Sequence, residues 1–149
     1  MRRTLVSAFA IFAAFAALTF CSPQKRDTPR ETLPPGWTDA VRYRCAGIGE
    51  AGSTNTNKIR RRGIAKAAAV EDAKSVASDR FARLRYRLGP DERVAEFMLD
   101  RIESEFGAEI DGGVVFRESY DDDDNCEVIL EIVSPDLLNR VLGQSPEYP

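Results

Sequence analysis

The pattern of apolar and polar positions predicts one dominant helix over residues 58–88. This stretch contains no proline and a single glycine, Gly63, and it is rich in Ala, Arg and Lys, which favour helices. Small and apolar residues recur in it at steps of three and four, the spacing of one helix face: Ile59, Gly63, Ala67, Val70, Ala73, Ala77, Phe81, Leu84 and Leu88. This face is small in its first half and bulky in its second. We therefore expect the first half to lie close to a flat surface such as a sheet.

Turn and capping residues set the expected limits of this helix. Thr56 or Asn57 can cap its first turn, and Gly89-Pro90 is expected to end it after Leu88. Residues 50–57 before it are rich in turn formers and predict a loop.

Alternation of apolar and polar residues predicts three strands. The first covers residues 40–49 and ends in Gly47-Ile48-Gly49, the second covers 108–120, and the third covers 126–133. Gly112-Gly113 suggests a bend or bulge near the start of the second strand. Residues 121–125 form a turn, so residues 113–133 are expected to fold as an antiparallel hairpin.

Two shorter helices complete the predicted domain. One runs from Pro90 to residue 106 and is closed by Gly107, and the other covers residues 135–142, with Ser134 as its cap and Gly143 at its end. The expected order is β-α-α-β-β-α. It predicts a two-layer α+β domain over residues 37–143, in which a small antiparallel three-stranded sheet is covered by the long Ala-rich helix, followed by a frayed tail at 144–149.

Residues 1–20 have the form of an export signal. Arg2 and Arg3 precede an apolar run over residues 5–20, which is the length of a signal sequence and short for a membrane-spanning helix. Polarity then changes abruptly at Cys21. Residues 22–36 are polar and carry four prolines, so residues 21–36 are expected to be a disordered tether.

The end of the leader, Leu18-Thr19-Phe20-Cys21, resembles the lipobox of bacterial lipoproteins. That resemblance implies that Cys21 becomes the lipidated first residue of the mature chain. Phe20 departs from the pattern, in which a small residue is expected. Two alternatives therefore stay open, a signal-peptidase cut near residues 14–16 and an uncleaved membrane anchor.

Composition excludes several classes of function. After the leader the chain has 19 basic and 24 acidic residues, so its net charge of −5 argues against a general nucleic-acid binder. The sequence contains no histidine, which removes the usual general base and the commonest transition-metal ligand. We therefore expect no enzyme, no cofactor and no metal centre.

Two charged runs are candidate binding sites. Basic residues open the long helix and could hold an anion such as a phosphate or a lipid head group, although a solvated helix face has the same composition: Lys58, Arg60, Arg61, Arg62 and Lys66. The acidic run 121–124 could bind calcium, but it lacks the spacing of a calcium loop and also suits a solvated turn.

Two further patterns have competing interpretations. Cys45 and Cys126 each lie on a predicted strand and are either a disulfide or small core residues. The letters GIGEAG at residues 47–52 match a dinucleotide-binding fingerprint, but a loop separates them from the helix, so we interpret them as a strand end.

An aromatic-led strand ending in Gly-Ile-Gly, followed by a loop and a long Ala-rich helix, resembles bacterial envelope lipoproteins of the LPP-twenty type. It is also similar to the N-terminal domain of the flagellar ring protein FlgT. The residues that carry the resemblance are Tyr43, Gly47, Ile48, Gly49, Ala65, Ala69, Asp72, Ala73 and Ala77. It covers residues 37–133 and implies an exported α+β domain without enzymatic activity.

Leader, tether and resemblance together predict a non-enzymatic cell-envelope lipoprotein. Its domain would lie outside the cytoplasm as a structural or binding module, held to a membrane by lipid on Cys21, with an envelope protein as a candidate partner and no nucleic acid. The alternative is a soluble exported subunit of a larger envelope or flagellar assembly.

Overall fold

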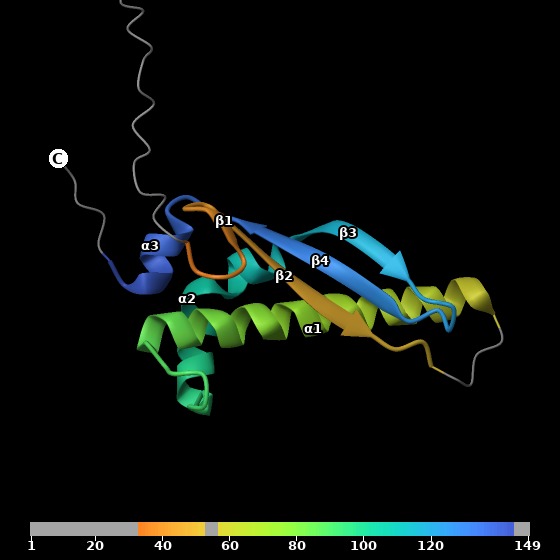
Figure 1. The fold of residues 1–149 in the computed structure, drawn as a ribbon, viewed down its shortest axis with the longest axis horizontal. Coiled ribbons are helices and arrows are strands. Elements are labelled where there is room, and N and C mark those ends of the chain that lie inside the picture. The colour runs from red at the N-terminus through yellow and green to blue at the C-terminus, as the bar shows by residue number, and fades with distance from the viewer. Residues whose placement is uncertain (1–32, 53–56, 145–149) are drawn as a thin grey trace, which may run out of the picture. The chain divides into compact units, whose positions relative to one another are not determined.

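A 29-residue helix, α1 (Lys58–Tyr86), runs along one face of a four-stranded antiparallel sheet (Figure 1). The computed structural model describes residues 33–52 and 57–144, and the leader, Cys21 and most of the predicted tether lie outside these residues. The sheet order is β1-β2-β4-β3, with β1 (Trp37–Asp39), β2 (Arg42–Gly49), β3 (Val114–Tyr120) and β4 (Cys126–Val133). Helices α2 (Glu96–Asp111) and α3 (Leu137–Leu142) complete the described fold. The α+β class and the antiparallel β3–β4 hairpin are confirmed.

The sheet differs from the prediction by one strand. Residues 37–39 form β1, which pairs antiparallel with β2 through Trp37 and Tyr43, and a turn at Ala40 and Val41 separates the two strands. The predicted first strand, residues 40–49, therefore begins two residues later than expected. Of the two strands of the β3–β4 hairpin, β2 pairs with β4. The two strands are antiparallel, with Arg42 opposite Val133 and Gly49 opposite Cys126.

Helix α1 begins where the sequence predicted. The side chain of Asn57 accepts hydrogen bonds from the backbone N–H groups of Ile59 (3.0 Å) and Arg60 (3.2 Å), which satisfies two of the free donors of the first turn. The helix ends earlier than predicted, at Tyr86, because Arg87 adopts a left-handed conformation with φ 55°. The Arg83 guanidinium then donates to the carbonyls of Gly89 and Glu92, which holds the following loop out of helical geometry.

The two glycines at the end of β2 allow α1 to approach the sheet closely. A Cβ atom on Gly47 would lie 2.2 Å from the carbonyl oxygen of Ala69, and one on Gly49 would lie 2.0 Å from that of Ala65. Only hydrogen fits at these positions, so the contact requires glycine on the strand and alanine on the helix. The predicted close approach of the first half of α1 to a sheet is confirmed.

The buried face of α1 is not the predicted one in its first half. Its fully buried residues follow a step of four up to Phe81: Ala65, Ala69, Ala73, Ala77, Phe81 and the neighbouring Ala82. Ile59 and Ala67 were expected to be buried but are exposed. Gly47 and Gly49 lie against Ala65, Ala69 and Ala73, so these small residues form the buried face, while Ile59 at the start of the helix is 84% exposed.

Helix α2 starts later and ends later than predicted. It begins at Glu96, and it continues through Gly107 to Asp111 because Ile110, 4% exposed, extends the buried face formed by Ile102 and Phe106. Helix α3 begins at Leu137, two residues later than predicted, and ends at Leu142 with Gly143 as its C-cap, as predicted. Ser134 does not cap it, because its hydroxyl accepts a hydrogen bond from the Arg140 guanidinium instead.

The core lies between the sheet and the helices. It contains a cluster of aromatic rings around Phe81, whose ring lies 5.1–5.8 Å, centroid to centroid, from those of Trp37, Tyr43 and Phe106. Every buried apolar residue of the described chain lies between Trp37 and Val141. Residues Thr32–Pro149 form one compact unit and so contain the complete core of the domain.

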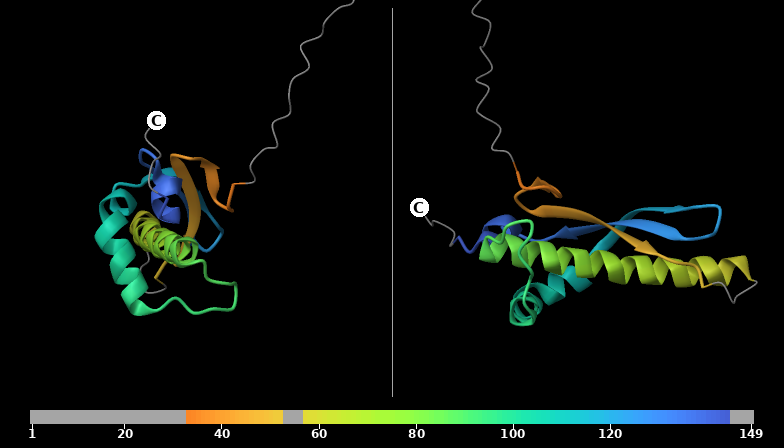
Figure 2. Two further views of the ribbon diagram at one scale, coloured as in Figure 1. Left: turned by 90° about the vertical axis from the view of Figure 1, so that its left-hand side faces the viewer. Right: turned by 60° about the horizontal axis from the view of Figure 1, so that its bottom comes forward.

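The three helices lie on one side of the sheet, as Figure 2 shows in two directions. On that inner side β2 and β4 bury alternate residues, among them Tyr43, Leu130 and Ile132. The residues between them point to the opposite side, which no element of the described chain covers. We call this side the outer sheet face, and it carries residues 42, 44, 46 and 48 of β2, residues 127, 129, 131 and 133 of β4, and residues 114, 116, 117 and 119 of β3.

Candidate functional site

The two charged runs that the sequence marked as separate candidates lie together in the fold. The Asp124 carboxylate at the tip of the β3–β4 hairpin accepts a hydrogen bond from Arg62 (2.8 Å) and forms ion pairs with Arg61 (3.8 Å) and Lys58 (3.9 Å). Arg61 also donates to the backbone carbonyl of Asp123. The start of α1 and the hairpin tip therefore neutralise one another.

Asp124 is the centre of this contact. It is 7% exposed and adopts a left-handed backbone conformation with φ 65°, which turns its carboxylate toward α1. The hydrogen bond from Arg62 lowers the pKa of this carboxyl group, and the charges of Lys58 and Arg61 add to the effect. Asp124 thus stays ionised to a lower pH than an ordinary aspartate.

The rest of the acidic run organises the turn. The Asp121 carboxylate accepts hydrogen bonds from the backbone N–H groups of Asp123 (3.0 Å) and Asn125 (2.8 Å) and from the Asn125 side chain (2.9 Å). These bonds lower the pKa of Asp121, the bond from the Asn125 side chain most of all. Asp122 and Asp123 are exposed. Within residues 33–52 and 57–144, no three His, Cys, Asp or Glu side chains come together in a way that could hold a metal ion.

Two members of the basic cluster lie outside the contact with Asp124. Lys66 pairs with Glu118 of β3, and the hydrogen bond to that carboxylate raises the pKa of Lys66. Arg60 is exposed and has no acidic partner among the described residues. Arg60 and the loosely paired Lys58 are therefore the charges of this cluster that the acidic side chains of the described residues neutralise least.

The two domain cysteines are buried free thiols. Cys45 lies opposite Leu130 and Cys126 opposite Gly49, so four residues of the β2–β4 ladder, about 13 Å, separate them. A disulfide needs Cα atoms no more than about 6.8 Å apart, so the candidate Cys45–Cys126 bridge is wrong for this fold and the core interpretation holds. Burial raises the pKa of Cys45 to about 12, and its thiol donates to the carbonyl oxygen of Ala73 (3.2 Å).

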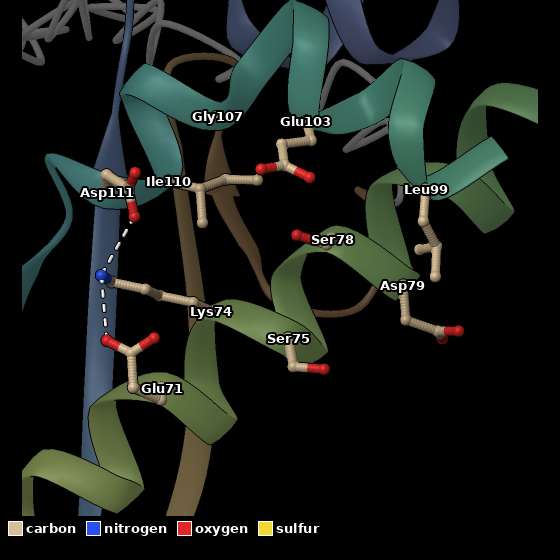
Figure 3. Close-up of a pocket in the computed structure, with 10 residues that line it drawn as sticks. All are labelled: Glu71, Lys74, Ser75, Ser78, Asp79, Leu99, Glu103, Gly107, Ile110 and Asp111. Carbon is tan, nitrogen blue, oxygen red and sulfur yellow. Dashed lines mark ion pairs between the residues drawn. The ribbon is translucent and has the colours of Figure 1, made fainter. Parts of the chain in front are cut away.

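A groove that the sequence did not indicate runs between α1 and α2 (Figure 3). It has a volume of about 390 Å³. Lys74 lies at one end between the carboxylates of Glu71 (3.1 Å) and Asp111 (3.0 Å), while Asp79 and Glu103 line the rest. Because its only cation is already paired twice, the groove presents a net negative surface.

The outer sheet face is the other feature that stands out. Four of its large apolar side chains are more than half exposed, namely Ile48 (66%), Val114 (62%), Phe116 (56%) and Val133 (54%). A register shift between Val115 and Arg117 marks a bulge at Phe116. The sequence predicts a bend or bulge nearby, at Gly112-Gly113, but the irregularity of the ladder lies three residues beyond Gly113, at Phe116.

One ion pair lies in the middle of the outer sheet face. Arg44 of β2 and Glu131 of β4 face each other directly in the ladder. The Nε and Nη2 atoms of Arg44 each lie 2.6 Å from Oε2 of Glu131. The Arg44 guanidinium also lies 3.6 Å above the ring of Phe116. Arg44 is thus held by both Glu131 and Phe116. Ala46 and Ile129 are the next pair of residues along the strands on this face.

Two observations bear on relatives and on membranes. The chain matches no protein-family model, no curated protein and no solved structure. None of the helices in residues 33–52 and 57–144 has both the length and the apolar character needed to cross a bilayer.

Proposed function

We propose that this chain is a non-enzymatic cell-envelope lipoprotein whose folded domain is a structural or binding module held at a membrane surface. The leader at residues 1–20, Cys21 and the proline-rich tether support export and anchoring. The resemblance to LPP-twenty lipoproteins agrees with this location.

The observation that carries the binding role is the outer sheet face. A sheet with one face packed on helices normally presents polar residues on the other, whereas this face has four large apolar side chains exposed by more than half. Large apolar side chains left exposed on one face, with charged residues among them, are a common feature of contact sites. The domain therefore acts through contact with another molecule.

The same face favours a second candidate function, a soluble exported subunit of an envelope or flagellar assembly. Both functions require the same contact surface, and they differ in whether Cys21 carries lipid.

Incorporation of labelled palmitate by cells that produce the full chain separates the two. We expect label on the wild-type chain and on Ser22→Ala, a matched change one residue further on, and no label on Cys21→Ser. In membrane fractionation, Cys21→Ser should move to the soluble fraction. Label that persists in Cys21→Ser refutes the anchor, and an unlabelled, soluble wild-type chain supports the assembly subunit.

A further inference from the structure

The two edges of the sheet differ in how they are protected against pairing with another chain. Strand β3, at one edge, has a bulge and exposes the charged Arg117 and Glu118, which are usual protections. At the other edge β1 covers β2 only as far as Arg44, whose N–H donates to the carbonyl of Gly36 (2.8 Å). Beyond it, residues 45–49 of β2 read Cys-Ala-Gly-Ile-Gly, with no charge and no proline. This part of the edge lacks protection.

The described chain before β1 does not continue along this edge. The N–H of Trp37 donates to the carbonyl of Pro34 (3.1 Å), and Gly36 between them has φ 91°, which forms a tight turn directly before β1. The turn reverses the chain. Residues 33 and 34 therefore do not extend β1 over residues 45–49 of β2.

The backbone of β2 presents hydrogen-bonding groups at this open edge. In an antiparallel ladder the N–H and C=O of one residue point to the same side, and successive residues alternate. Arg44 points away from β4, because its N–H bonds to Gly36, and so does Ile48, whose N–H donates to the Asp72 carboxylate (2.9 Å). Ala46 lies halfway between them and points the same way, but its N–H has no acceptor in the described part of the chain. The open edge thus offers one N–H, of Ala46, and the carbonyls of Ala46 and Ile48.

One flank of α1 lies beside this edge and is not covered by the sheet. The bond of Asp72 to Ile48 fixes which flank it is, and residues at steps of four from Asp72 share that side of the helix. They are Ile64 (46% exposed), the exposed Ala68 and Val76 (40% exposed). On the opposite flank Lys66 pairs with Glu118 of β3, so the sheet extends over that side. A further strand beside β2, about 4.8 Å away, would lie over the uncovered flank.

We propose that residues 45–49 of β2 bind an extended segment of a partner protein, which adds a fifth strand to the sheet. A carbonyl of the segment accepts the N–H of Ala46, and its N–H groups donate to the carbonyls of Ala46 and Ile48. Because side chains alternate along a strand, one set lies over Ile64 and Val76 of α1 and the other lies beside Ile48 on the outer sheet face. The segment is therefore apolar at alternate positions.

The backbone groups of this edge decide between possible partners. A helix cannot make these bonds, because its own N–H and C=O groups are bonded within it. A second copy of β2 is a poor match, since its N–H groups at Arg44 and Ile48 are already taken and only that of Ala46 is left. An extended peptide brings all of its N–H groups. This proposal rests on the proposed binding role and names the chemistry of the partner, and it does not depend on lipid at Cys21.

A synthetic peptide tests the edge directly. The probe is a heptapeptide with valine at its second, fourth and sixth positions, threonine between them and lysine at both ends. It is added to residues 32–149, which contain the complete core, and the amide signals are followed by NMR. We expect a dissociation constant of about a millimolar, as suits a short strand. At saturation the hydrogen exchange of the Ala46 amide should slow at least fivefold, because its N–H becomes bonded.

A second peptide separates strand pairing from attraction between charges. It has the same lysines but proline at its central position, so it lacks the central N–H and cannot pair as a strand. We expect it to leave the exchange of the Ala46 amide unchanged.

A matched pair of variants tests the part played by α1. Ile64→Asn removes an apolar side chain from the flank beside the edge and should weaken binding of the valine peptide at least threefold. Ile59→Asn makes the same change at an 84% exposed position of the same helix, away from this flank, and should leave binding unchanged.

Three results would overturn the proposal. These are an Ala46 amide that the valine peptide leaves unchanged at 5 mM, a proline peptide that protects it equally, and an Ile59→Asn variant that loses as much binding as Ile64→Asn. Should a variant fail to fold, the two peptides on the wild-type domain decide alone. Because the test omits the leader, its failure leaves the palmitate result for Cys21 standing, and the reverse also holds.

Discussion

Substitution of Gly47 or Gly49 by alanine should destabilise the domain strongly, although each change adds only a methyl group. Elsewhere, replacement of glycine by alanine at a compatible site stabilises a protein by roughly 0.4–1 kcal/mol, because the unfolded chain loses freedom. Here the new Cβ would lie 2.0 Å from the Ala65 carbonyl oxygen for Gly49, and 2.2 Å from that of Ala69 for Gly47. Both obstacles are helix backbone, which cannot rotate out of the way. The sign of the effect is therefore reversed.

The magnitude follows from how far α1 must move. To bring a 2.0 Å contact to the 3.0 Å that a Cβ atom tolerates, the helix must withdraw by about 1 Å, a gap that forfeits up to half of the dispersion energy along the contact. Overpacking of a core costs about 1–3 kcal/mol, and a clash with helix backbone belongs at the upper end. We expect a loss of about 3 kcal/mol of unfolding free energy and a fall in Tm of about 12 °C or more.

Urea and thermal unfolding of residues 32–149, followed by circular dichroism, measure this loss. Gly63→Ala is the matched control, because a Cβ at this exposed helical position has nothing within 4 Å. It should raise stability by roughly 0.5–1 kcal/mol through better helix propensity. Losses below about 1 kcal/mol for both Gly47→Ala and Gly49→Ala would refute the close approach of β2 and α1.

Two further predictions concern titratable groups. Because the folded-state pKa of Asp124 is lowered from 3.8, its contribution to stability is present above that pH and is lost as pH falls through the folded value. Urea unfolding at pH 7 and pH 3 should therefore show a smaller pH dependence for Asp124→Asn than for the wild type or for the exposed control Asp122→Asn, and equal slopes would contradict the contact with α1. Cys45 and Cys126 should resist alkylation at pH 8 in the native domain, and both should react in urea without a reductant. A thiol count of zero in urea would instead show a disulfide.

Local patterns predicted most of the elements, because each depends on neighbours in sequence. Asn57 at the start of α1, the alternation in β4 and Gly143 after α3 all act within one turn or one strand. The helix and strand boundaries that were predicted wrongly depend on contacts between residues distant in sequence, or belong to very short elements. Strand β1 has only three residues, too few for a pattern, and α2 begins at Glu96 because Arg83 of α1 holds the preceding loop.

The pairing inside the basic cluster could not be predicted for the same reason. Arg62 and Asp124 are 62 positions apart in sequence. They meet because the β3–β4 hairpin is long enough to reach the start of α1, and the length of a strand is known only to within a few residues from its pattern. Each charged run is visible alone in the sequence, but the ion pairs between the two runs depend on the fold.

The end of β2 shows why the sequence does not predict the exposed apolar residues of the outer sheet face. In an ordinary half-buried strand the larger residues point to the core, but Gly47-Ile48-Gly49 places its two glycines inward and its isoleucine outward. The inward positions are fixed by the close approach of α1, which tolerates no side chain there. Nothing in that contact requires an apolar residue at position 48, where a polar side chain would fit equally well. The exposed Ile48 is thus not a consequence of packing within the domain, and with Val114, Phe116 and Val133 it is one of four large apolar side chains that the proposed contact surface would cover.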